Sequence, residues 1–168
     1  MGLIHVMISL VPDKYRWVST LAGMKGSMDT GLNEIRQVAE YSGPDQVTRM
    51  YKAQATFFLA FITLNLRKDK KDALVYLDYL KNQSPGDPPL KSPLLIYGRA
   101  SILMKNGFND EALEVLQERS SLPQTFRFCF LDYLEGMARL NKLDTKAASS
   151  FEQFISGFRG QYYIRSAY

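Results

Sequence analysis

The sequence contains one cysteine and one histidine, and this scarcity excludes several kinds of chemical site. Cys129 cannot form a disulfide within the chain, and one Cys with one His cannot supply the four ligands of a structural zinc site. A catalytic triad would depend on His5, which stands in an apolar stretch with no carboxylate before Asp13. The glycine-rich phosphate loops and the G-x-S-x-G turn of hydrolases are also missing. The sequence therefore predicts a protein that is not an enzyme and that uses neither a metal nor a cofactor.

Long hydrophobic runs and a dominant charge are absent as well. The apolar stretch at residues 2–11 has about half the length that a bilayer span requires, and no basic segment or A-x-A cleavage site accompanies it. Lys and Arg number 21 against 17 acidic residues, which gives a net charge of +4, and the basic residues are scattered along the chain. The sequence therefore predicts no membrane span and no nucleic-acid partner.

One apolar pattern is present three times, and it consists of a small residue followed by a large apolar residue four positions later. The copies begin at Ala73, at Ala112 and at the pair Ala147 and Ala148. From residue 73 to residue 112 the step is 39 residues, and from 112 to 147 it is 35, close to the roughly 34-residue period of tetratricopeptide repeats. The copies read Ala73, Leu77, Leu80; Ala112, Leu116, Arg119; and Ala147, Phe151, Phe154.

The spacing of Pro, Gly and Asp indicates short helices, and no stretch alternates with period two for long enough to indicate a strand. We expect an all-α, right-handed helical-repeat superhelix in one domain (1–168), as a fragment of a longer protein. N-terminal helices occupy 2–41, and repeats occupy about 46–85, 93–122 and 124–157. The nine expected helices cover about 2–11, 14–23, 29–41, 46–66, 70–83, 93–106, 109–119, 124–141 and 144–157, with Asp29, Asp69, Asn109 and Asp144 as caps.

The repeat register requires small residues at specific positions. In the second repeat, Ala100 and Ala112 stand where two helices approach closest, and Gly107 stands at the turn between them, in a left-handed conformation. The third repeat has Gly136, Ala138, Leu143 and Asp144 in the same places, with a turn one residue shorter. The first repeat has Phe61 and Lys68 there instead, so we expect its two helices to splay. Residues 84–93 hold four of the seven prolines and are expected to form a stiff, extended linker.

The N-terminal third carries a more specific pattern of short motifs. It contains Gly2-Leu3, Ser9-Leu10, Pro12 with Lys14, the run from Ala22 to Gly26, and Gly31-Leu32 at the start of a helix. This order resembles the opening of the tetratricopeptide repeat 39 and inclusion body clearance family, and the resemblance extends over nearly the whole chain. It implies a helical-repeat adaptor without enzymatic activity, and in some members a role in protein quality control or lipid regulation.

A stack of such repeats leaves a concave wall made by the first helix of each pair. An apolar wall favours a protein–protein scaffold that binds an apolar or amphipathic helix, with Tyr97 and Tyr133 as anchors. A clamp for a C-terminal carboxylate is disfavoured, because Lys105 and Asn65 stand only at the edge of this wall. The predicted groove residues are Phe58, Ile62, Tyr97, Ser101, Met104, Tyr133 and Met137.

Two other interpretations remain open. The chain can be a structural repeat segment whose groove is filled by its own first helix, around Ile4, Met7 and Ile8, or, with least support, an enzyme with an unrecognised site. Residues 160–168 are expected to begin an apolar helix without a partner helix in this chain. We expect that segment to fray or to dock on a second copy, so that a homodimer is possible.

Overall fold

The computed structural model describes residues 1–17, 23, 26–81, 92–122, 127–160 and 163–167, and this part of the chain is entirely helical. It contains nine α-helices and two short 3-10 helices and no strand, which confirms the all-α prediction. The α-helices are α1 (Gly2–Ser9), α3 (Met28–Ala39), α4 (Gln46–Asn65), α5 (Lys70–Lys81), α6 (Pro93–Lys105), α7 (Asn109–Gln117), α8 (Phe130–Asn141), α9 (Ala147–Gly157) and α10 (Ile164–Ala167), and the 3-10 helices are η1 (Asp13–Tyr15) and η2 (Glu118–Ser121).

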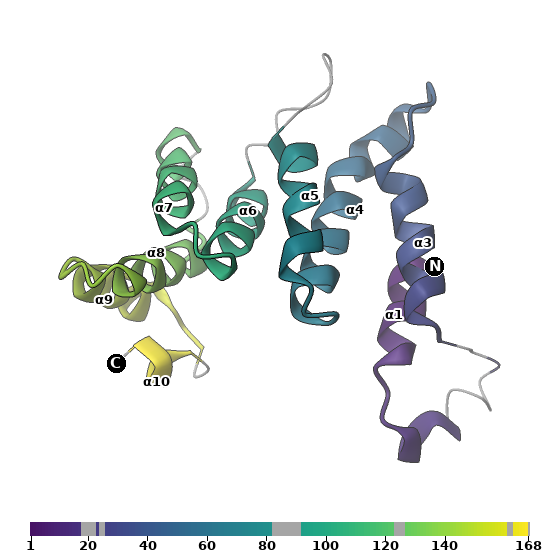
Figure 1. Cartoon of the computed structure of the whole chain (residues 1–168), viewed down its shortest axis with the longest axis horizontal. Coiled ribbons are helices and arrows are strands. Elements are labelled where there is room, and N and C mark those ends of the chain that lie inside the picture. The colour runs from purple at the N-terminus through teal and green to yellow at the C-terminus, as the bar shows by residue number, and fades with distance from the viewer. Residues whose placement is uncertain (18–22, 24–25, 82–91, 123–126, 161–162, 168) are drawn as a thin grey trace.

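The helices follow one another in a curved row, from α1 and α3 at one end to α8, α9 and α10 at the other (Figure 1). Three hairpins make up most of the row, and they pair α4 with α5, α6 with α7, and α8 with α9. The first helices of the hairpins also touch, because α4 contacts α6 and α6 contacts α8. Side chains from α4, α6 and α8 therefore share one face of the molecule.

The turns of the three hairpins have a common backbone feature. Each contains one residue with a positive φ, and these are Lys68 at 58°, Gly107 at 88° and Leu143 at 57°. In the second and third hairpins the residue after it donates its backbone N–H five residues back: Phe108 to Leu103 at 3.0 Å and Asp144 to Arg139 at 2.9 Å. These bonds satisfy carbonyl groups at the helix end, as in a Schellman motif. The predicted left-handed turn at Gly107 is confirmed.

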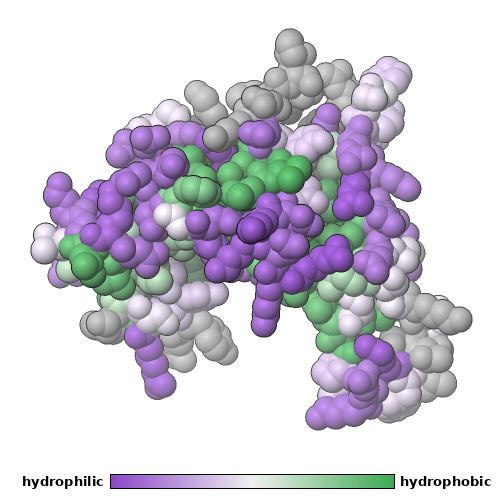
Figure 2. Space-filling model, viewed as in Figure 1, coloured by the Kyte–Doolittle hydropathy of each residue, from purple (hydrophilic) through white to green (hydrophobic). Residues whose placement is uncertain are grey.

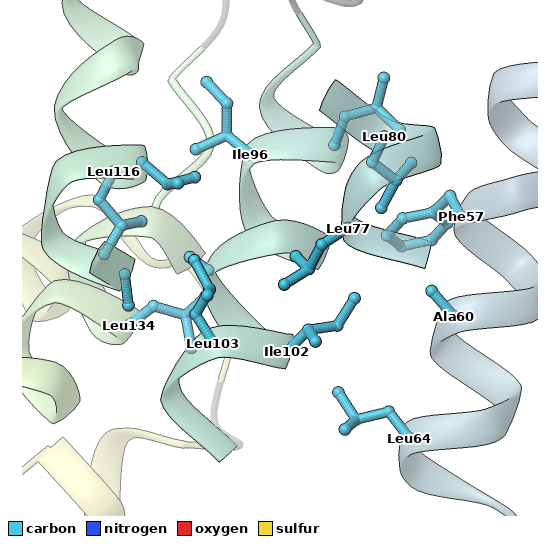
Figure 3. Packing of buried hydrophobic residues seen from close by; sticks show 14 of the residues in the cluster. Phe57, Ala60, Leu64, Leu77, Leu80, Ile96, Ile102, Leu103, Leu116 and Leu134 are labelled. Carbon is cyan, nitrogen blue, oxygen red and sulfur yellow. The ribbon is translucent and has the colours of Figure 1, made fainter. Parts of the chain in front are cut away.

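The larger hydrophobic core joins the first hairpin to the second and the second to the third. Leu77 and Leu80 of α5 meet α6 on one side, and Leu116 of α7 and Leu134 of α8 meet it on the other (Figure 3). Ala100 is 1% exposed and lies in this core with Ala112, so the α6–α7 crossing holds the small residues that the register predicts. Large side chains therefore pack around alanines where two helices come close.

A second core lies at the N-terminal end of the row and joins α1 and α3 to the outer face of α4. Gly2 and Gly31 meet where α1 crosses α3, and a Cβ placed on Gly31 would lie 2.6 Å from the carbonyl oxygen of Gly2. A side chain at Gly31 does not fit this crossing, since the nearest atom belongs to the backbone of Gly2 and cannot move aside as a flexible side chain can. The core residues are Val6, Leu32, Ile35, Ala39, Ala55, Leu59 and Ile62.

Three of the four predicted helix caps are wrong, and these are Asp29, Asn109 and Asp144. Ser27, in place of Asp29, caps α3, because its extended backbone lets its Oγ accept the N–H of Thr30 at 3.2 Å. Asn109 is the first residue of α7 and not its cap, since its amide Nδ2 donates to the carbonyl of Gly107 at 3.3 Å. The predicted cap Asp69 does accept the N–H of Asp72 at 3.0 Å.

Asp144 is not the cap of α9, which begins at Ala147, three residues later than predicted, with Lys146 at the N-cap position. The Oδ1 of Asp144 accepts the N–H of Lys146 at 2.9 Å, in the turn before α9. The helix predicted at 124–141 begins at Phe130, with residues 123–126 outside the described part. The helix predicted at 14–23 is represented by η1 at Asp13–Tyr15, and 18–22 are not described. Most of the predicted linker, 82–91, also lies outside the described residues.

Candidate functional site

The face shared by the first helices of the hairpins holds a cavity of about 270 Å³, which we call the groove. Its floor is apolar, and Ala60, Leu64 and Ile102 lie on facing sides of it between α4 and α6 (Figure 3). Polar atoms enter it only from a few side chains, as is usual in binding sites. Among the other groove residues are Phe57, Phe61 and Asn65 of α4; Tyr97, Ser101, Met104 and Lys105 of α6; Tyr133 and Met137 of α8; and Tyr163 from the C-terminal segment.

Five of the seven predicted groove residues line this cavity, namely Tyr97, Ser101, Met104, Tyr133 and Met137. The two from α4 do not. Ile62 is 3% exposed and belongs to the N-terminal core, and Phe58 packs between the two cores.

Phe57 and Phe61 take the places that were predicted for Phe58 and Ile62. A shift of one residue turns a side chain by about 100° around a helix, which is enough to move it from one face to the next. The rotation of α4 about its axis could not be predicted from the sequence, because α4 is apolar on several sides. These apolar sides pack against α3 and the N-terminal core as well as against α5 and α6.

One end of the groove is aromatic. The Tyr97 ring packs edge-on against Phe128 and Phe130, with centroids 5.8 and 6.3 Å away. Tyr133 and Tyr163 meet at 5.5 Å, and Tyr163 also meets Phe130 at 5.4 Å. These edge-to-face contacts hold the tyrosine rings in fixed orientations. The aromatic end therefore offers a preformed surface to a ligand.

The Tyr97 hydroxyl is held in its neutral form. Burial raises the pKa of Tyr97, and the neighbouring hydroxyls of Tyr163 and Tyr133 raise it further, while a hydrogen bond with Ser101 acts in the opposite direction. A neutral hydroxyl can both donate and accept a hydrogen bond. Tyr97 and Ser101 thus form a small polar spot in an otherwise apolar wall.

The other end of the groove is polar and positively charged. The Nζ of Lys105 donates to the Oδ1 of Asn65 at 2.6 Å, which links the C-terminal ends of α6 and α4. Partial burial lowers the pKa of Lys105, and the positive charge of Lys70 lowers it further. Within the described part of the chain no carboxylate forms an ion pair with Lys105. Both residues, predicted at the edge of the wall, line the cavity itself.

Both termini pack on neighbouring helices of the same chain, while docking of the C-terminal segment on a second copy stays a prediction. The first helix does not enter the groove: α1 packs on α3 at the far end of the row, and Ile4 and Met7 are 47% and 68% exposed. The close Gly2–Gly31 crossing explains this placement. The C-terminal segment, which was expected to fray or to dock on a second copy, packs on α9 through the buried Ala167, and its Tyr163 lines the groove.

A network of alternating charges, which the sequence did not reveal, lies outside the groove. Asp132 binds Arg119 and Arg127, both at 2.9 Å, and Glu135 binds Arg119 and Arg139. The outermost contact joins Arg139 to Asp144 at 2.8 Å. Three arginines thus meet three carboxylates and tie η2 and the α9 turn to α8. Only the Glu135–Arg139 pair has the i, i+4 spacing that a sequence can show.

The visible face of the molecule is mostly hydrophilic, with a few hydrophobic areas (Figure 2). Among the described helices none is both long and apolar enough to cross a membrane. The described residues also contain no cluster of three His, Cys, Asp or Glu side chains that could hold a metal ion.

In comparisons with known proteins, no protein-family model, no curated protein and no solved structure matches the chain.

Proposed function

We propose that this chain is a right-handed, tetratricopeptide-like superhelix and acts as a non-enzymatic scaffold for protein–protein interaction. Recurrence along the chain supports the repeat assignment: the positive-φ turn residues stand at 68, 107 and 143, so the steps between them are 39 and 36 residues. Ala73 and Ala112 are both fully buried at equivalent places in the second helix of their hairpins. The adaptor role implied by the resemblance to the tetratricopeptide repeat 39 and inclusion body clearance family agrees with this proposal.

The observation that carries the proposed function is the groove between α4, α6 and α8. It is apolar along its floor and has ordered tyrosines at one end, which suits the apolar face of an amphipathic helix from a partner protein. Tyrosine is a frequent anchor in such contacts because a rigid ring offers a large area and one hydroxyl. Tyr97 and Tyr133 would provide most of the binding energy.

A second candidate function has one observation in its favour. Tyr163 occupies part of the groove wall, so the chain's own C-terminal segment covers some of the surface that a ligand would use. In this alternative the chain is a structural repeat segment that closes its groove with itself. The two candidates differ in whether an added peptide binds.

A direct binding measurement tests the proposal. A fluorescein-labelled 18-residue amphipathic model helix is titrated with the protein, and anisotropy reports binding. We expect saturable binding that weakens at least about thirtyfold in Tyr97→Ala and in Tyr133→Ala, since truncation of an anchor residue removes about 2 kcal/mol or more.

Tyr79→Ala is the matched control, because Tyr79 is exposed on α5 and does not line the groove. Circular dichroism checks that each variant keeps its helical content. Binding that is unchanged in both groove variants would place the interaction surface elsewhere, and the absence of binding by the unaltered protein would favour the self-filled alternative.

A further inference from the structure

The positively charged end of the groove holds a lysine whose charge has no counterpart in the described chain. Several other basic residues of the hairpins are paired with carboxylates: Arg99 with Glu118 at 2.8 Å, Lys142 with Asp110, and Arg139 with Asp144 at 2.8 Å. Lys105 has only the neutral oxygen of Asn65 as a partner, at 2.6 Å. A lysine that lies beside an apolar floor and has no carboxylate partner can form an ion pair with an acidic group of a ligand.

The hydrogen bonds around Lys105 leave it able to bind another acceptor. The Nδ2 of Asn65 donates to the carbonyl of Phe61 at 2.9 Å, and this fixes the amide so that its Oδ1 faces Lys105. An ammonium group has three N–H donors, and Asn65 uses one of them. The nearby Lys70 adds a second positive charge to this end of the groove. The local potential therefore favours an anion over a neutral group.

The groove is thus asymmetric, with an aromatic end and a cationic end. Tyr97 and Lys105 stand eight residues apart on the same helix, α6, which separates them by about 12 Å at 1.5 Å per residue. A ligand that satisfies both ends carries an apolar anchor and a negative charge at about that separation. In a helical ligand this corresponds to about two turns.

We propose that the occupant of the groove is an amphipathic helical segment of a partner protein that carries an aspartate or glutamate, whose carboxylate binds Lys105 while an apolar side chain about two turns away packs on Tyr97 and Tyr133. This inference rests on the proposed scaffold function and specifies its ligand. It is distinct from capture of a chain-terminal carboxylate, because the carboxylate that binds Lys105 belongs to a side chain within the bound helix.

Three model peptides test the inference. They are fluorescein-labelled 18-residue amphipathic helices that are identical except at one position, seven residues from a leucine anchor on the same face, where they carry Glu, Gln or Lys. We expect the Glu peptide to bind the unaltered protein about threefold to tenfold more tightly than the Gln peptide, as for one charge-assisted hydrogen bond at a partly exposed site. The advantage should shrink as salt is raised.

Variants of the lysine assign the preference to its charge. In Lys105→Met the Glu and Gln peptides should bind equally, and in Lys105→Glu the preference should reverse towards the Lys peptide. Lys146→Met is the matched control, because Lys146 is exposed and outside the groove, and it should keep the preference for Glu.

The outcomes separate the inference from the function on which it rests. If the Glu and Gln peptides bind the unaltered protein equally and Tyr97→Ala weakens both, the charged end does not select the ligand, and the inference is wrong while the scaffold function stands. If a preference for Glu survives in Lys105→Met, another group recognises the carboxylate, and the inference is again wrong. If none of the peptides binds, the scaffold function itself is refuted.

Discussion

Replacing Ala100 by leucine tests the helix register at the centre of the molecule. Ala100 is 1% exposed, on the face of α6 that packs into the larger core with Ala112 and Leu116. Leucine adds three carbon atoms at this crossing. Burying them would be favourable in an open cavity, but in a filled core they force side chains from their rotamers or push α6 away from α7.

The expected loss in the free energy of unfolding is about 1 to 3 kcal/mol for an overpacked core site. Urea denaturation followed by circular dichroism at the helix band measures it. With a urea dependence of about 2 kcal/mol per molar for a domain of this size, a loss of 2 kcal/mol lowers the midpoint by about 1 M. The slope of the transition should stay the same, because the surface exposed on unfolding hardly changes.

Ala148→Leu is the matched control, since Ala148 is exposed on α9 and the substitution is otherwise identical. There the change should be within about 0.5 kcal/mol, as for other surface substitutions. A midpoint for Ala100→Leu that equals that of the unaltered protein would refute the register, because it would mean that α6 turns another face towards α7.

Two further predictions concern the termini of the helices. Gly31→Ala places a Cβ 2.6 Å from the carbonyl oxygen of Gly2, so it should separate α1 from α3, and hydrogen exchange at the backbone amides of α1 should accelerate while α6 remains protected. Lowering the pH below about 4 should destabilise the fold, and Asp45→Asn and Asp144→Asn should reduce this dependence. The pKa of Asp45 lies below its usual 3.8 chiefly because Thr48 donates to it, and that of Asp144 chiefly because of the Lys146 N–H. A carboxylate whose pKa is lower in the folded state than in the unfolded state stabilises the fold at pH values above its unfolded pKa. This stabilisation is lost as the pH falls through the folded pKa. A urea midpoint that stays constant as the pH is lowered from 5 to 2 would therefore contradict this attribution.

The sequence predicted the hairpins because their local signals agree with their packing. Small residues at Ala73, Ala100 and Ala112 recur at the spacing that close helix crossings require, and Gly107 marks a turn that needs a left-handed residue. The helix starts were less accurate. Ser27 and not Asp29 is the N-cap of α3. Which residue caps the helix depends on the backbone angles of the preceding segment, and the residue types alone do not reveal these angles.

The residues of the candidate site could be predicted where one face of a helix packs in the hydrophobic core and the opposite face lines the groove. Tyr97, Ser101 and Met104 satisfy this on α6, and all three line the groove. Pairs between distant residues, such as Lys105 with Asn65 or Arg119 with Asp132, left no trace in the sequence, because long-range contacts depend on how helices are stacked. The contribution of Tyr163 was missed for the same reason.

The position of α4 links the N-terminal helices to the groove. Its Ile62 lies in the N-terminal core, its Leu64 lies in the larger core, and its Phe61 and Asn65 line the groove, so four residues within about one turn serve three surfaces. A packed core does not deform continuously, and a helix that is fixed on two sides transmits displacement as a rigid body. α4 is thus the helix that joins the N-terminal core to the charged end of the groove, while the residues that line the groove come from α4, α6, α8 and the C-terminal segment.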